Sequence, residues 1–209
     1  LFVAEHLREL MAGLGIRTVE DLIGRRDLLR ERTDRPVWLE SLDLSPILAH
    51  PRTAGHPAPI RTSPQDHALD QKIDPEIIVE AEPALAKGTP VVIERPIQNI
   101  NRTFGAMLAG EVARRVGPAG LPDGTITLKV HGAGGQSFGA FAMTGTDIEL
   151  TGPVNDYCGK GLSGGRIIVR AAADAGYDVS NSTYVGNVAL YGATSGQAFL
   201  RGRAGERFC

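Results

Sequence analysis

A glycine recurs about every 20 residues through the second half of this chain, and this period constrains the fold more than any other feature. Gly124, Gly145, Gly165, Gly186 and Gly205 follow one another at intervals of 21, 20, 21 and 19 residues. The first four are each followed directly by a short segment rich in β-forming residues: TITLKV, TDIEL, RIIVR and NVALY. A fixed period of this length is typical of repeat proteins, in which each unit buries its apolar face against its neighbours.

The period predicts a mainly β fold, a parallel β-helix with about 20 residues per coil. Glycine reaches positive φ without steric cost, so the repeating glycines are expected at the corners. The segment GQSF (135–138) recurs as GQAF (196–199) 61 residues later, which supports a repeat of about three coils. Alternation along each strand predicts which side chains face inward. The expected core residues are Ile126, Leu128, Ile148, Leu150, Ile168, Val188 and Leu190.

Several of these segments carry a family resemblance. GGQSFGAF (134–141), NDYCGKGLSGGRIIV (155–169), GNVALYGATSGQAF (186–199) and RAGERF (203–208) resemble the C-terminal Gly-rich (GXGXG) domain of the glutamate synthase large subunit. The resemblance is dense over 97–209 and looser before it. It implies a right-handed β-helix with a structural role. It also places the chemistry, glutamine hydrolysis and reductive transfer of ammonia to 2-oxoglutarate on FMN with an iron–sulfur cluster, in domains that precede this one.

The resemblance predicts three regions. Residues 1–30 resemble the tail of the FMN-binding synthase domain, 31–96 form a connector, and 97–209 form the Gly-rich domain. Of the 13 prolines, 12 lie at or before Pro122, and they forbid a long helix in the connector. Leu1 is not methionine and Cys209 lies inside a family motif, so the chain is expected to be a fragment of a longer protein.

Composition excludes several classes of function. The net charge is −2 with no basic stripe, so no nucleic-acid surface is predicted. The sequence has no apolar segment near the ~20 residues of a membrane span and no signal peptide, and a cytoplasmic location is expected. Two cysteines, Cys158 and Cys209, make no disulfide framework and are interpreted as small packing residues.

Local signals predict the helices. Val3, Leu7, Leu10, Met11 and Leu14 share one face of a helix that ends at Gly13 and Gly15. Thr18 is expected to cap a second short helix, with Asp21 at its third position. Asp74 and Pro75 are expected to begin a helix over 76–87, perturbed at Pro83 and stopped at Gly88. A strand is expected at 91–94, and an amphipathic helix carries Met107, Leu108, Val112 and Val116, which is expected to cap the first coil.

Candidate chemistry is sparse. Gly159, Gly161 and Gly164 match G-x-G-x-x-G, but a turn precedes the motif and RIIVR follows it, whereas a dinucleotide site needs a strand before and a helix after. Asp147, Glu149 and Asp156 are a candidate carboxylate set for acid–base chemistry, although solvated surface and turn roles are the favoured interpretation.

The remaining polar candidates are weaker still. Lys160 and Arg166 flank the most Gly-rich corner and are candidates for an interdomain or phosphate contact, with surface charge as the default. Ser163 has no His–Asp arrangement nearby in sequence. His50, His56 and His67 lie at spacings unrelated to a zinc site. No catalytic, cofactor-binding or metal-binding residue is therefore predicted.

The favoured interpretation is a fragment of glutamate synthase that holds catalytic domains in register. FMN and the iron–sulfur cluster would belong to the full-length protein, and none is expected within this fragment. The expected partners are other domains of the same polypeptide, with a small electron-donating subunit or ferredoxin, and neither nucleic acid nor membrane. Two alternatives remain open: a stand-alone or subunit scaffold, as in split glutamate synthases or formylmethanofuran dehydrogenase, and an independent β-helix hydrolase or lyase. The sequence does not select NADPH, NADH or ferredoxin as electron donor.

Overall fold

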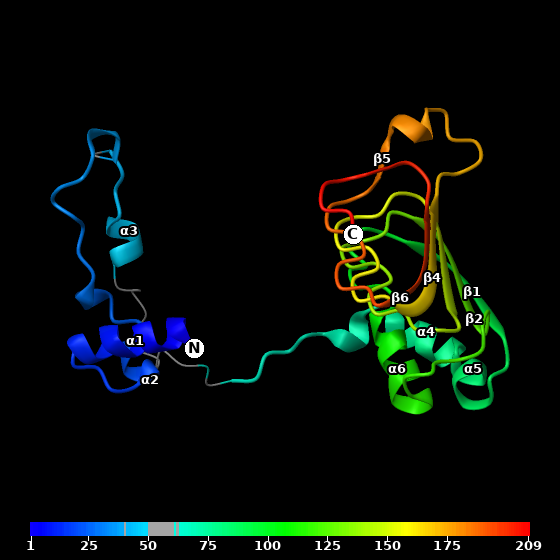
Figure 1. Cartoon of the computed structure of the whole chain (residues 1–209), viewed down its shortest axis with the longest axis horizontal. Coiled ribbons are helices and arrows are strands. Elements are labelled where there is room, and N and C mark those ends of the chain that lie inside the picture. Colours follow the sequence, from blue (N-terminus) through cyan, green and yellow to red (C-terminus); the bar gives the residue numbers. More distant parts are fainter. Residues whose placement is uncertain (40, 50–60, 62) are drawn as a thin grey trace. The chain divides into compact units, whose positions relative to one another are not determined.

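The computed structural model describes residues 1–39, 41–49, 61 and 63–209. The chain divides into two units, Leu1–His67 and Ala68–Cys209 (Figure 1). His50, His56 and three of the connector prolines, Pro51, Pro57 and Pro59, lie outside the described residues. The predicted region boundaries at 30 and 96 concern membership of a longer protein and stay predictions.

The first unit consists of short helices. They are α1 (Phe2–Gly13), α2 (Val19–Leu22), η1 (Arg26–Leu28), η2 (Val37–Leu39) and α3 (Ser45–Leu48). The predicted end of the first helix is confirmed, since α1 stops at Gly13 and Gly15 has φ +72°. The Thr18 hydroxyl accepts a hydrogen bond from the Asp21 amide at 3.1 Å, which confirms the predicted cap of α2. Such a cap stabilises a helix by about 1 kcal/mol.

The second unit holds all the strands that the structure describes. Its elements are η3 (Leu69–Gln71), α4 (Asp74–Glu80), α5 (Glu82–Lys87), β1 (Val91–Ile97), α6 (Ala106–Val116), β2 (Ile126–Gly132), β3 (Thr146–Thr151), β4 (Ser163–Arg170), η4 (Val179–Asn181), β5 (Thr183–Val185), β6 (Ser195–Leu200) and β7 (Arg203–Ala204). Helices α4, α5 and α6 lie together against one end of the sheet (Figure 1).

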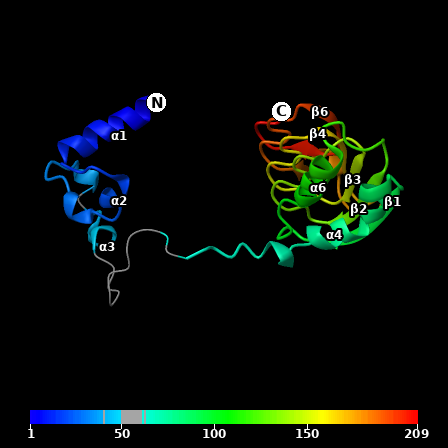
Figure 2. The same cartoon turned by 90° about the horizontal axis from the view of Figure 1, so that it is seen from below.

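Five strands form one parallel sheet in the order β1-β2-β3-β4-β6, and β5 pairs with β7 in a second, two-stranded sheet (Figure 2). In the larger sheet Val91 pairs with Ile126, and Ile126 with Thr146. Farther along, Asp147 pairs with Arg166, and Arg166 with Gln197. Successive partners are therefore 35, 20, 19 and 31 residues apart.

This register corrects the predicted fold class. The protein is a mixed α/β fold with a five-stranded parallel sheet flanked by helices, and 29% of the described residues are helical and 21% are in strands. The expectation of a mainly β, right-handed parallel β-helix is wrong. The 20-residue period applies only to β2, β3 and β4. The connection from β1 to β2 contains α6, and the connection from β4 to β6 contains η4 and β5.

The last predicted repeat is also misplaced. NVALY forms a turn, in which Val188 and Leu190 have φ of +58° and +59° and are only half-buried. Strand β6 begins later, at Ser195, and contains the second copy of the GQSF-like segment, whereas the first copy lies in a turn. The equivalence inferred from these two segments is therefore wrong. Sequence similarity over four residues did not report the backbone conformation that each segment adopts.

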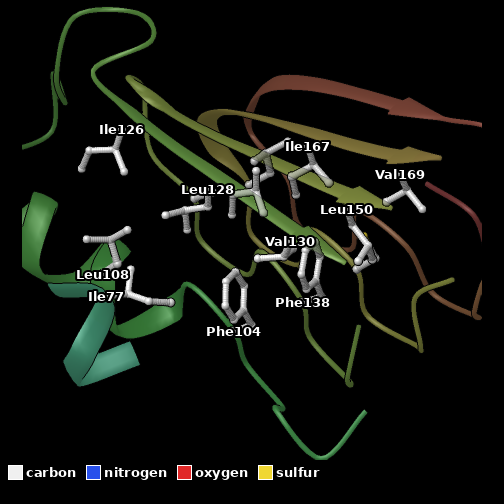
Figure 3. Packing of buried hydrophobic residues seen from close by; sticks show 14 of the residues in the cluster. Ile77, Phe104, Leu108, Ile126, Leu128, Val130, Phe138, Leu150, Ile167 and Val169 are labelled. Carbon is white, nitrogen blue, oxygen red and sulfur yellow. The ribbon is translucent and has the colours of Figure 1, made fainter. Parts of the chain in front are cut away.

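The core lies between the sheet and the chain that returns from each strand (Figure 3). Ile126, Leu128, Ile148 and Leu150 are fully buried, which confirms four predicted core residues. Ile168 is only half-buried, because inward and outward positions alternate along β4 and place Ile167 and Val169 inside. The rings of Phe104 and Phe138 stack 5.4 Å apart within the same core. Burying one of the isoleucine or leucine side chains of this core contributes about 1.5–3 kcal/mol.

Asp74 joins two helices rather than capping its own. The predicted cap is wrong: Asp74 is the first residue of α4, and Ile73 precedes the helix. The buried Asp74 carboxylate instead accepts hydrogen bonds from the amides of Gly105 and Met107, at 3.0 and 2.9 Å, where α6 begins. Burial raises the pKa of this carboxyl, and the backbone donors oppose that shift. Asp74 therefore satisfies helix-end amides that α6 cannot satisfy itself.

Replacing Asp74 should separate α4 from α6. We expect Asp74→Ala to lower the free energy of unfolding by about 1–3 kcal/mol, because two amides at the start of α6 lose their acceptor. Urea denaturation followed by circular dichroism measures this loss. The matched control is Asp70→Ala, an exposed carboxylate on η3, which should change stability by less than about 0.5 kcal/mol. Equal effects of the two substitutions would contradict the assignment.

Glycines at the strand ends allow the chain to pass close to itself. Gly124 (φ +70°) and Gly145 (φ +87°) precede β2 and β3, as predicted for corners, whereas Gly165, Gly186 and Gly205 do not have positive φ. The tightest approach involves Gly132 and Gly152. A Cβ on Gly132 would overlap the carbonyl oxygen of Ile97, and one on Gly152 would overlap the carbonyl oxygen of Gly132. Three successive strands can therefore end in register only with glycine at these positions.

Gly152→Ala should be strongly destabilising. We expect a loss of at least about 2 kcal/mol, because the methyl group meets backbone and φ is +144°. Thermal unfolding by calorimetry gives the measurement. Gly110→Ala is the matched control, since Gly110 lies in α6 and its added Cβ meets nothing within 4 Å. This control should gain about 0.5–1 kcal/mol from helix propensity.

Candidate functional site

A series of stacked turns forms the side of the second unit that carries the candidate site. A strand of the larger sheet, together with the chain that leads to the next strand, makes one layer of the stack. In the turn of each layer, two residues of positive φ are separated by one residue of negative φ. The first such residues of successive layers are Thr103, Ser137, Tyr157, Val188 and Arg207, and the next are Gly105, Gly139, Gly159, Leu190 and Cys209. We call these five turns the turn ladder.

Backbone hydrogen bonds join the turns of the turn ladder in both directions. The amides of Ser137 and Tyr157 donate to the following layer, to the carbonyls of Asp156 and Asn187 at 2.8 and 3.0 Å. The amide of Gly159 donates back to Phe138 at 2.9 Å. A Cβ on Gly159, where φ is +65°, would meet the end of the Leu190 side chain at 2.6 Å, and that side chain would have to shift. These contacts fix the spacing of side chains that point outward from the turns.

The G-x-G-x-x-G motif runs from the turn ladder into the start of β4. Gly159 and Gly161 lie in the turn ladder, and Gly164 lies in β4 with φ +106°. A strand follows the motif, so the context is that of a turn and not of a dinucleotide fingerprint, as the sequence indicated. The Ser163 hydroxyl donates to the Gly161 carbonyl at 2.8 Å and thereby closes the same turn.

A pocket of about 840 Å³ lies along the outside of the turn ladder. It is lined by Arg102, Gln136, Ser137, Tyr157, Lys160, Val188, Tyr191, Arg207 and Cys209. Three of these residues are cationic and none is acidic. Lys160 was a candidate from the sequence. Arg102 and Arg207 were missed, since only the stacking of the layers brings positions 105 residues apart into one pocket.

Contacts within the pocket orient its polar groups. Arg102 Nη2 donates to the side-chain oxygen of Gln136 at 2.8 Å. Lys160 Nζ lies 5.6 Å from the ring centroid of Tyr157, close enough for a cation–π contact. The rings of Tyr157 and Tyr191 meet edge to face with centroids 6.5 Å apart. The pocket therefore presents cations and aromatic rings, of which Arg102, Tyr157 and Tyr191 contact residues of an adjacent layer. Such a surface suits a ligand that carries several negative charges.

The predicted carboxylate set is not brought together. Asp147 and Glu149 lie on β3 and pair across the sheet with Arg166 and Arg170 of β4, at 2.9 and 3.5 Å. Asp156 lies in the turn ladder, where its carboxylate accepts the Asn187 amide at 2.7 Å.

Partial burial nevertheless raises the pKa of Asp147, and this effect outweighs the opposing charge of Arg166. In this arrangement Asp147 and Glu149 contact arginines of the adjacent strand, and Asp156 accepts a hydrogen bond within the turn ladder.

Lys160 and Arg166, the two candidates for an interdomain or phosphate contact, do not share one site. Lys160 faces the pocket of the turn ladder, whereas Arg166 lies on β4 and contacts Asp147 and Gln197, the latter at 3.0 Å. In the described parts of the chain, no group of three or more His, Cys, Asp or Glu residues is placed to hold a metal ion. Of the three histidines considered for a zinc site, only His67 lies in the part of the chain that the structure describes.

The two cysteines have opposite environments. Cys158 is buried in the core, and burial raises the pKa of its thiol to about 12. Cys209 is exposed and lines the pocket. Because the thiolate is the reactive form, Cys158 is a packing residue, as its sequence context suggested.

Alkylation distinguishes these two environments. With iodoacetamide on the folded protein, we expect modification of Cys209 and protection of Cys158 at both pH 7 and pH 9, because the buried thiol stays neutral below about 12. Peptide mass spectrometry gives the site and extent of labelling. After unfolding in urea both residues should react. Equal labelling of the folded protein would show that Cys158 is accessible.

None of the helices within the described ranges combines the length and apolar character needed to cross a bilayer.

Stacked turns that contain glycine, joined to a five-stranded parallel sheet, define a Gly-rich α/β module. The chain belongs to the GXGXG motif family, whose pattern matches residues 74–209. Along its whole length it is also similar to glutamate synthases, which confirms the resemblance seen in the motifs.

Three relatives illustrate the range of this similarity. Over 99% of the chain it is 42% identical to the NADH glutamate synthase of Saccharomyces cerevisiae. Over the entire chain it is 44% identical to the NADPH glutamate synthase large chain of Bacillus subtilis and 38% identical to the chloroplastic ferredoxin-dependent enzyme of Spinacia oleracea. The chain spans only 10%, 14% and 13% of the lengths of these proteins, respectively.

Proposed function

We propose that this chain is part of a glutamate synthase, which transfers the amide nitrogen of glutamine reductively to 2-oxoglutarate and gives two glutamates. The observation that carries the proposal is the continuous similarity of 38–44% over nearly every residue of the chain. This similarity extends into the first unit, before the residues that the family pattern covers. A stand-alone GXGXG module would have no reason to share that preceding segment.

Within such an enzyme, the proposed role of this region is mechanical. It would act as a scaffold that holds catalytic domains at fixed positions. The turn ladder supports this role, because hydrogen bonds in both directions and glycine contacts leave its layers little freedom to slide. The acids on the sheet surface support it too, since they pair with arginines of the adjacent strand.

The proposal places FMN and the iron–sulfur cluster outside this chain. Iron–sulfur clusters are held by cysteine thiolates, and the described chain offers two cysteines, of which Cys158 is buried with a strongly raised pKa. These residues do not fit a cluster. The proposed partners are other domains of the same polypeptide and a small electron-donating subunit or ferredoxin, and the proposed location is the cytoplasm. The names of the relatives include three electron donors, so this segment does not select among them.

An isotope experiment on the full-length protein tests the proposed function. The full-length protein, purified together with its electron-donating subunit where it has one, is given glutamine labelled with ¹⁵N in the amide, 2-oxoglutarate, and in turn NADPH, NADH or reduced ferredoxin. We expect ¹⁵N-labelled glutamate with one donor, and no label in the α-amino position when 2-oxoglutarate is omitted. Mass spectrometry of the product gives the measurement. Absence of label with all three donors would overturn the assignment and favour a scaffold outside the enzyme.

A further inference from the structure

The cations of the turn-ladder pocket have no carboxylate partner, whereas half of the 18 arginines of the protein do. Nine arginines form ion pairs with Asp or Glu in the described chain: Arg8, Arg25, Arg32, Arg35, Arg95, Arg114, Arg115, Arg166 and Arg170. Among the residues that the structure describes, Arg102, Lys160 and Arg207 have no acid within ion-pair distance. A protein with a net charge of −2 thus leaves three cations uncompensated in one pocket.

The three cations follow the direction in which the layers stack. Arg102 precedes the first turn of the turn ladder, Lys160 lies in the third, and Arg207 lies in the fifth. Neighbouring strands are about 4.8 Å apart, so two layers correspond to about 10 Å and the series to about 20 Å. An elongated ligand matches a row of this length better than a single phosphate does. An extended polypeptide rises about 3.3 Å per residue and covers this length with about six residues.

We propose that the turn-ladder pocket is the docking site for an acidic segment of the longer polypeptide, outside residues 1–209. This inference rests on the proposed function, which makes this region a scaffold for other domains. Carboxylates about three residues apart along the segment would contact Arg102, Lys160 and Arg207 in turn. Tyr157 and Tyr191 would receive the intervening side chains. Charge complementarity of this kind fixes register and partner choice more than it adds affinity.

Relatives about seven to ten times as long as this chain provide the source of such a segment, because the chain covers 10–14% of their length. The rigidity of the turn ladder favours docking, since its cations are carried by backbone that is already ordered. Little conformational entropy of the scaffold is then lost on binding.

Zero-length crosslinking of the full-length protein tests this contact. A carbodiimide activates a carboxylate, and an amine that touches it displaces the activating group to form an amide, while the carbodiimide leaves as a urea. We expect Lys160 to be joined to an Asp or Glu outside residues 1–209, identified by peptide mass spectrometry. Lys129, which is exposed on β2, is the internal control and should give at least fivefold less of this product.

Two variants separate charge from chance proximity. Lys160→Arg keeps the charge but lacks a primary amine, so the crosslink must disappear. Arg102→Glu combined with Arg207→Glu leaves Lys160 in place and should lower the crosslink yield at least fivefold, whereas Lys129→Glu should not change it. The yield should also fall in high salt, because exposed charge contacts are screened.

The inference is overturned if Lys160 gives no crosslink, or if it is joined only to acids within residues 1–209. The isotope experiment on the same preparation separates the two proposals. Labelled glutamate without the Lys160 crosslink would remove the docking proposal alone. A crosslink without labelled glutamate would remove the glutamate synthase assignment and leave the docking site established.

Discussion

Close approach of successive backbone segments is the constraint on which the second unit depends. Strands β2 and β3 end where the preceding layer passes so near that a single methyl group on Gly132 or Gly152 would overlap one of its carbonyl oxygens. The same demand recurs in the turn ladder, where Gly159 meets Leu190. Once the layers are this close, their amides reach the carbonyls of the layers on either side, and hydrogen bonds join the turns as well as the strands. The apolar core then fills the space between these two hydrogen-bonded sides.

This arrangement gives the two sides of the second unit different properties. On the sheet, parallel register sets Asp147 beside Arg166, and the two side chains form an ion pair. On the turn ladder, residues from five layers meet in one pocket, and its cations find no acid there. The uncompensated side is the one suited to receive another part of the protein. A rigid module that has ion pairs on its sheet and unpaired cations in its turn-ladder pocket is consistent with a scaffold in a larger enzyme.

The relatives named for NADH, NADPH and ferredoxin share this segment to a similar degree. A region that determined the electron donor would be expected to differ among them. The glycine contacts and the turn ladder depend on backbone geometry, which is indifferent to the donor. The three kinds of glutamate synthase therefore share this segment whatever their electron donor. The proposed contact with an acidic segment can be tested in any of them.

Local chemistry determined much of the secondary structure from sequence alone. Thr18 capped α2, Gly88 ended α5, and the alternation of Ile126, Leu128, Ile148 and Leu150 identified the core of β2 and β3. The fold class was wrong because a glycine period reports turns, not what fills the connections: α6 and the segment before β6 changed the spacing to 35 and 31 residues. Only tertiary structure decided that Asp74 caps a distant helix and that Arg102 shares a pocket with Arg207. Both depend on stacking between residues far apart in the chain, which no local pattern encodes.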